Sequence, residues 1–177
     1  MLIAVALLAP LCHITTPARA EETAPDLEYK VKAAYMYNFI RFIDWPTDRL
    51  DNKDTPIQLC VLGADPFGPH LDPIVERTAL GHGLQLQHYP TFTQDIAACH
   101  ILFINEPEPT KLVKILDQIT WLGTMTVGDS HDFAKLGGII GFVIQDGKVR
   151  LEINQQVALK KGFRISAKLL ELARIVD

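Results

Sequence analysis

The sequence has few cysteines, few aromatic residues and no strong excess of charge. Its 177 residues include 3 Cys and 8% aromatic residues, and 17 Lys and Arg stand against 21 Asp and Glu, so the net charge is −4. So few cysteines exclude a small scaffold built on disulfides, and the near balance of charge argues against a nucleic-acid partner. With 48% apolar residues, the composition is that of an ordinary globular protein with one hydrophobic core.

The sequence also lacks the common motifs of phosphate binding and nucleophilic catalysis. It contains no G-x-x-x-x-G-K-S/T loop and no G-x-S-x-G turn. The glycines at 81 and 83 precede an expected strand instead of following one, so they lack the helix N-terminus that binds a pyrophosphate. The histidines are scattered, without an H-x-x-x-H or H-x-H pair. We therefore expect no enzymatic activity, no cofactor and no metal site.

An apolar run near the start predicts an export signal. Residues 2–11 are apolar, and a small-x-small site, Ala18-Arg19-Ala20, precedes two glutamates. A run of this length makes about 15 Å of helix, whereas the hydrocarbon core of a membrane is about 30 Å thick. We expect residues 1–20 to be a cleaved signal peptide and residues 21–177 to form a single α/β domain that does not insert into the membrane.

Export would leave two cysteines, Cys60 and Cys99, in an oxidising compartment. A bridge between them would close a loop across 39 positions, and the chain-entropy model assigns such a bridge about 4 kcal/mol. The alternative is two unpaired buried thiols, which are common in protein cores. Both cysteines lie on or beside apolar runs of strand length, so we favour a Cys60–Cys99 disulfide that joins two elements of one sheet.

Strand and helix patterns alternate through most of the chain. Strands are expected at 57–62, 84–88, 100–105 and 124–127, helices at 71–77, 94–98 and 110–119, a hairpin with an Asp-Gly turn at 139–144 and 149–153, and helices at 155–160 and from Ser166 onward. This order predicts an α/β fold with a mostly parallel sheet covered by helices and an antiparallel hairpin edge near the C-terminus.

The longest helical pattern, residues 27–44, has two apolar faces. One face carries Leu27, Val31, Ala34, Tyr35, Asn38 and Phe42, and the nearly opposite face carries Ala33, Met36, Tyr37, Ile40 and Ile43. Either the helix is sandwiched inside the domain, or its second face contacts another protein chain. We take the second set as the candidate partner or dimer interface.

Asp129 follows an expected strand at the position where α/β folds bind ligands. The same position commonly holds a turn-forming Asp, and without a partner base or lysine we interpret Asp129 as a turn residue. Together with Gly63 and Asp65, which follow the strand at 57–62, Asp129 is the site of a weaker alternative. In that alternative the protein is a periplasmic small-ligand carrier or sensor.

Seven short blocks across the expected mature chain resemble the YfiR-like periplasmic proteins in residues and order. They are YKVKAAYMYNF at 29–39 with WP at 45–46, CVLG at 60–63 with DPFG at 65–68, CHILFI at 99–104, TVGD at 126–129, GGII at 137–140, VRLEIN at 149–154 and GFRISAKLL at 162–170.

The resemblance implies a small periplasmic protein, often dimeric, that acts by binding. It implies repression of an inner-membrane diguanylate cyclase through the cyclase's periplasmic sensor domain, and thereby negative control of cyclic-di-GMP signalling and biofilm formation. Cys60 and Cys99 match one of the family's disulfides. Residues 137–154 contain no Cys, so the resemblance does not extend to redox sensing through a second bridge.

Overall fold

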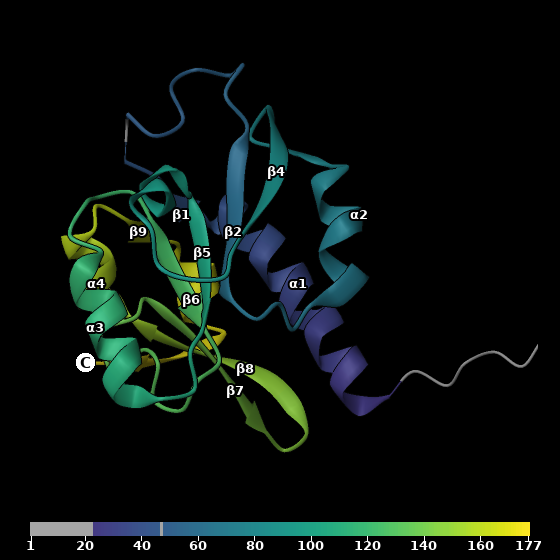
Figure 1. Cartoon of the computed structure of the whole chain (residues 1–177), viewed down its shortest axis with the longest axis vertical. Helices are drawn as coiled ribbons and strands as arrows, with labels where there is room; N and C mark the ends of the chain where they lie inside the picture. The colour runs from purple at the N-terminus through teal and green to yellow at the C-terminus, as the bar shows by residue number, and fades with distance from the viewer. Residues whose placement is uncertain (1–22, 47) are drawn as a thin grey trace, which may run out of the picture.

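The computed structural model describes residues 23–46 and 48–177, so the expected signal peptide at 1–20 lies outside the described residues. This part of the chain forms a mixed α/β structure with helices on both faces of a central sheet (Figure 1). The α/β fold with a mostly parallel sheet and a C-terminal antiparallel hairpin is confirmed.

The main sheet has eight strands in the order β10-β8-β7-β6-β5-β2-β4-β3. The strands are β2 (Ile57–Gly63), β3 (Thr78–Ala79), β4 (His82–Tyr89), β5 (Ile101–Asn105), β6 (Met125–Gly128), β7 (Ile140–Gln145), β8 (Lys148–Asn154) and β10 (Ala173–Val176). Five strands that are neighbours in this order, β7, β6, β5, β2 and β4, run parallel. β8 pairs antiparallel with β7, and β10 pairs parallel with β8. A second, two-stranded sheet pairs β1 (Ile43–Asp44) with β9 (Arg164–Ile165).

Helices cover both faces of the main sheet. They are α1 (Ala24–Phe42), η1 (Gly68–Leu71), α2 (Asp72–Val75), η2 (Gln94–Ala98), α3 (Pro109–Gln118), α4 (Gln155–Lys160) and α5 (Ala167–Leu170). Leu59 and Val61 of β2 pack into the cluster beneath α1, whereas Cys60 and Leu62 pack into the cluster formed with α3 and η2. Because both faces are covered, the central strands have the continuous apolar sequences typical of parallel sheets.

Helix α1 buries the face that the sequence analysis assigned to a partner, and this assignment is wrong for four of its five residues. Ala33, Met36, Ile40 and Ile43 are buried in the core of this chain, and Tyr37 is half-buried and packs against that core. The four buried side chains cannot contact another protein unless the helix separates from the sheet.

The opposite face of α1 is the one that faces outward. Leu27 is 51% exposed and Val31 is 37% exposed. Ala34 is also exposed, and Tyr35 is half-buried. Both faces are apolar, so helical periodicity alone did not distinguish the side that packs on the sheet.

The C-terminal segment differs from the long amphipathic helix expected from Ser166. The Ser166 hydroxyl accepts a hydrogen bond from the Leu169 amide and caps α5, but this helix ends at Leu170. The chain then forms β10, whose residues pair with 151–154 of β8. Pairing with β8 satisfies the backbone groups that a longer helix would have satisfied internally.

The short strands β1, β3 and β9 were not predicted. Each has two residues and depends on a partner strand distant in sequence or on a tight turn. Among the described residues, no helix has the length and apolar character needed to span a membrane.

Candidate functional site

A polar pocket of about 1080 Å³ opens at the carboxyl ends of β5, β6 and β7. Its other walls come from the first half of α1, the β7–β8 hairpin and the segment that leads into β10. Ligands of α/β proteins commonly bind at this edge of the sheet. The charged side chains of the lining are Glu28, Lys32, Asp129, Asp132, Lys135, Arg150, Glu152, Glu171 and Arg174.

Lys32 is the buried cation at the base of this pocket. Its side chain is only 3% exposed, and its Nζ lies 2.5 Å from Oδ2 of Asp129 and 2.5 Å from Oε1 of Glu28. Glu28 lies one turn earlier on α1, and Asp129 follows β6. A buried ammonium requires such partners, because an unpaired charge in the interior is strongly unfavourable.

Tyr29 completes this cluster from the same helix. Its hydroxyl donates a hydrogen bond of 2.9 Å to Oδ2 of Asp129, and the Nζ of Lys32 lies 4.2 Å from its ring centroid. Burial, together with the negative charge of Asp129, raises the pKa of Tyr29 above its ordinary value. The hydroxyl therefore stays protonated and acts as a donor at neutral pH.

A second ion pair also lines the pocket. Glu152 of β8 is 2% exposed, and the guanidinium of Arg174 on β10 donates to its carboxylate. Arg174 itself is largely exposed. The pocket therefore presents both positive and negative groups. Arg150 and Glu171 also line it, and neither forms an ion pair within the described part of the chain.

Only one of the three residues proposed for a small ligand lines this pocket. This residue is Asp129. Asp129 was interpreted as a turn residue because the sequence showed no lysine partner for it, and the structure supplies that partner in Lys32. Gly63 and Asp65 lie outside the lining.

These two residues instead have structural contacts of their own. Gly63 has φ +93°, and a Cβ there would lie 2.5 Å from the carbonyl oxygen of Asn105, so glycine is required. The Asp65 carboxylate accepts a hydrogen bond from the Phe67 amide and lies 3.2 Å from Nε2 of His88.

The roles of Lys32 and Tyr29 were not predicted from the sequence. One available signal was that Lys32 lies one turn before Met36, on the apolar stripe that α1 buries. A lysine on a buried stripe requires a carboxylate partner, although the sequence does not identify which one.

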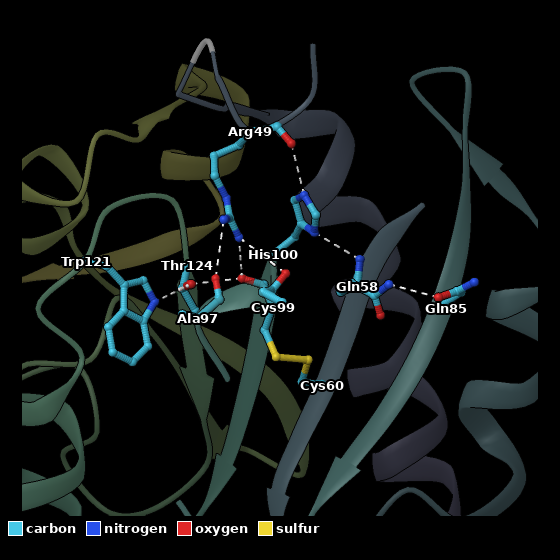
Figure 2. The surroundings of a disulfide bond; sticks show 10 residues. Arg49, Gln58, Cys60, Gln85, Ala97, Cys99, His100, Trp121 and Thr124 are labelled. Atoms are coloured by element: carbon cyan, nitrogen blue, oxygen red, sulfur yellow. Dashed lines mark hydrogen bonds between the residues drawn. A yellow bond between two sulfur atoms is a disulfide. The ribbon is translucent and has the colours of Figure 1, made fainter. Parts of the chain in front are cut away.

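Cys60 and Cys99 are joined in the expected disulfide, with their Cα atoms 5.9 Å apart. Cys60 lies on β2, and Cys99 immediately follows η2 (Figure 2). Both are buried. The bridge therefore ties the segment before β5 to the central strand β2.

Two polar side chains hold the backbone around this bridge. Arg49 donates hydrogen bonds to the carbonyl oxygens of Ala97, Ala98 and Cys99. Burial lowers the pKa of the Arg49 guanidinium. Figure 2 shows how this side chain reaches the end of η2 from the loop that precedes β2.

His100 is held as a neutral ring. Its Nδ1 accepts a hydrogen bond from the Gln58 amide, so its Nε2 carries the proton and donates to the Arg49 carbonyl oxygen (Figure 2). Burial lowers the pKa of His100, and the nearby charge of Arg49 acts in the same direction. These contacts are structural and show no nucleophile with its base. In the described part of the chain, no group of three or more His, Cys, Asp or Glu side chains could hold a metal ion.

The chain is similar in fold to solved structures. A search of curated proteins finds no match. Among solved structures, the chain is similar to an ABC domain from Streptococcus pneumoniae in complex with L-Trp, with a TM-score of 0.52 and 9% sequence identity. The similarity covers 84% of this chain and 60% of that chain. At this identity it supports the fold alone.

A protein-family comparison covers nearly all of the described chain. Residues 29–174 match the family described as YfiR/HmsC-like. This range extends from Tyr29 in the Lys32 cluster to Arg174 of the second ion pair in the pocket lining. The chain therefore belongs to the YfiR/HmsC-like family.

Proposed function

We propose that this protein is a periplasmic regulator that represses an inner-membrane diguanylate cyclase by binding its periplasmic sensor domain. Repression would lower cyclic-di-GMP and limit biofilm formation. The observation that carries this proposal is the family match over residues 29–174. The proposal includes export, with removal of residues 1–20, and a homodimeric mature protein.

The rim of the polar pocket is the surface that we propose for the sensor domain. Ile144 on the hairpin is 52% exposed and Leu172 before β10 is 61% exposed, and both line the pocket. Exposed apolar side chains around buried charged groups are typical of an interface in which apolar anchors exclude water from polar contacts. The exposed Leu27 and Val31 of α1 lie one turn apart, beside the pocket-lining Glu28 and Lys32.

The test compares binding of the periplasmic cyclase domain to the mature protein and to Ile144→Asp and Leu172→Asp variants, by calorimetry. We expect each variant to weaken binding about tenfold or more, as loss of an interface anchor does. Leu159→Asp is the matched control, because Leu159 is 56% exposed on α4 and lies outside the pocket lining. Equal binding by all three variants would place the interface elsewhere, and no binding by the unaltered protein would contradict the proposed function.

Export has its own measurement. Fractionation of cells that express the full chain, followed by mass determination of the periplasmic product, should give a chain that begins at Glu21. Retention of residues 1–20 would contradict cleavage at the Ala18-Arg19-Ala20 site.

A second candidate function is supported by the pocket itself. Its volume and mixed charges suit a small ligand with both anionic and cationic groups, so the protein could sense a metabolite and act on an envelope signalling protein. A thermal-shift screen of charged metabolites tests this, since a ligand at 100 times its Kd adds about 2.7 kcal/mol of stability. Arg150→Ala should abolish the shift caused by any ligand that binds in the pocket. Absence of a shift with every compound would favour the first function alone.

A further inference from the structure

Strand β4 leaves most of its outer edge unpaired. On its inner side it pairs with β2 from Leu84 to Tyr89. On its outer side, β3 pairs only with His82 and Gly83. β4 is therefore the last long strand at this margin of the sheet (Figure 1).

The hairpin between β3 and β4 determines which backbone groups point outward. The two residues of its loop both have positive φ, as in a type I′ turn. His82 is the first residue after this turn, so its backbone N–H and C=O both point toward β3. Backbone groups alternate in direction along a strand, so those of Leu84, Leu86 and His88 also point away from β2. Beyond Gly83, no strand of the described chain pairs with them.

Up to Tyr89, this edge lacks the features that normally prevent another strand from adding to it, and Pro90 then ends it. Natural edges carry charged residues, Pro or bulges for this purpose. Residues 84–89, LQLQHY, contain no Asp, Glu, Lys, Arg or Pro, and Gln85, Gln87 and His88 are exposed. Although the whole chain has a net charge of −4, a second copy would meet this edge without repulsion between fixed charges on the paired strands.

We propose that two copies of this chain associate by antiparallel pairing of their β4 strands about a two-fold axis at Gln87. Because β3 already occupies the edge at Gly83, the axis lies toward the end of β4. With Gln87 on the axis, Leu86 of each copy is opposite His88 of the other. The outward N–H and C=O groups of these two residues then form the hydrogen bonds between the copies.

The side chains at the axis are self-complementary. Gln87 faces its own copy at a non-hydrogen-bonded position, where side chains lie closest. A side-chain amide both donates and accepts, so two identical amides can pair. The surface rests on the homodimer included in the proposed function, but it does not depend on which signalling protein is bound.

The first test is Gln87→Glu in the mature protein, measured by sedimentation equilibrium over a range of concentrations. This change places two carboxylates directly opposite each other, which destabilises strand pairing. We expect the dimer Kd to rise about tenfold. The control is Gln94→Glu, because Gln94 is exposed on η2 and lies outside β4, and the dimer Kd of this variant should stay unchanged.

The second test uses Gln87→Cys, because residues at a non-hydrogen-bonded position have Cα atoms about 4.5 Å apart, within disulfide range. Mild oxidation should give a covalent dimer on a non-reducing gel. Gln85→Cys should not, because Gln85 would lie opposite Tyr89 of the other copy.

A monomer at every concentration would overturn the proposal. A dimer that neither weakens with Gln87→Glu nor crosslinks through Gln87→Cys would also overturn it, and would place the homodimer on another surface. If the chain is monomeric and Gln87→Glu abolishes its binding to the cyclase domain, the proposal is also overturned, because this edge would then bind the cyclase domain. Failure of the cyclase domain to bind the unaltered protein would contradict the proposed function and leave this test unaffected.

Discussion

At the scale of single residues, the most demanding position is Lys32. Its ammonium is buried and is compensated by carboxylates from its own helix and from the end of β6. The two carboxylates take the place of the water that would solvate the ammonium at the protein surface, so the loss of either one is costly. The cluster therefore fixes the first half of α1 against the carboxyl edge of the sheet.

Lys32→Ala should reduce the free energy of unfolding by about 3 kcal/mol, because it leaves the Asp129 carboxylate without its cation in a partly buried place. Urea denaturation measures this change. Lys111→Ala is the control, since its ion pair with Glu108 is exposed to solvent and should contribute little to stability. Equal losses in the two variants would contradict a structural role for the Lys32 pair.

His100 predicts a pH dependence of stability. Its pKa is lowered in the folded protein, whereas in the unfolded chain it is about 6.5. As pH falls below about 6.5, the unfolded state binds the proton first, so stability is full above this pH and is lost below it, at up to about 1.4 kcal/mol per pH unit.

Urea unfolding at several pH values between 7.5 and 5 tests this for the unaltered protein and for His100→Gln. The variant should be less stable at pH 7.5 but should lose less stability on acidification. The same slope in both proteins would show that other groups cause the pH dependence.

At the scale of elements, α1 has two apolar faces with opposite roles. Met36 is fully buried beneath the helix, whereas Val31 on the outer face is 37% exposed. Phe39 and Phe142 stack with ring centroids 6.0 Å apart, so the inner face also locks the helix to the hairpin. The side chains of the inner face therefore contribute much more to the stability of the fold than those of the outer face, even though both faces are apolar.

Met36→Ala should destabilise the protein by about 3 kcal/mol, because it leaves a cavity in the core. Val31→Ala should change stability by about 0.5 kcal/mol or less. Thermal denaturation of both variants checks the assignment of the two faces. A larger loss for Val31→Ala would reverse it.

At the scale of the whole molecule, the Cys60–Cys99 bridge joins the start of β5 to the central strand. It spans 39 positions, and such a loop constrains the unfolded chain more than the folded one. The bridge is buried in the α3-side cluster, so its contribution is to global stability.

Removal of this bridge by Cys60→Ala with Cys99→Ala should lower the free energy of unfolding by about 4 kcal/mol. Urea denaturation of the oxidised protein, the reduced protein and the double variant measures it, and the last two should agree. A free-thiol count of two in protein isolated from the periplasm would contradict the bridge.

Local sequence patterns are sufficient for the fold class and the family resemblance, whereas the disulfide was favoured because export would leave only two cysteines. Apolar runs of strand length such as 57–62 and 100–105 identify buried parallel strands wherever their neighbours lie. The Asp-Gly turn predicted the β7–β8 hairpin for the same reason, since its backbone requirement lies within a few residues.

Tertiary structure alone decided the rest. The sheet selected which apolar face of α1 is buried, and pairing with β8 turned the expected C-terminal helix into β10. The pocket required Lys32 and Asp129, which are 97 positions apart, to meet. Such pairings depend on the order of strands in the sheet, and helical or strand periodicity carries no information about a partner so distant in sequence.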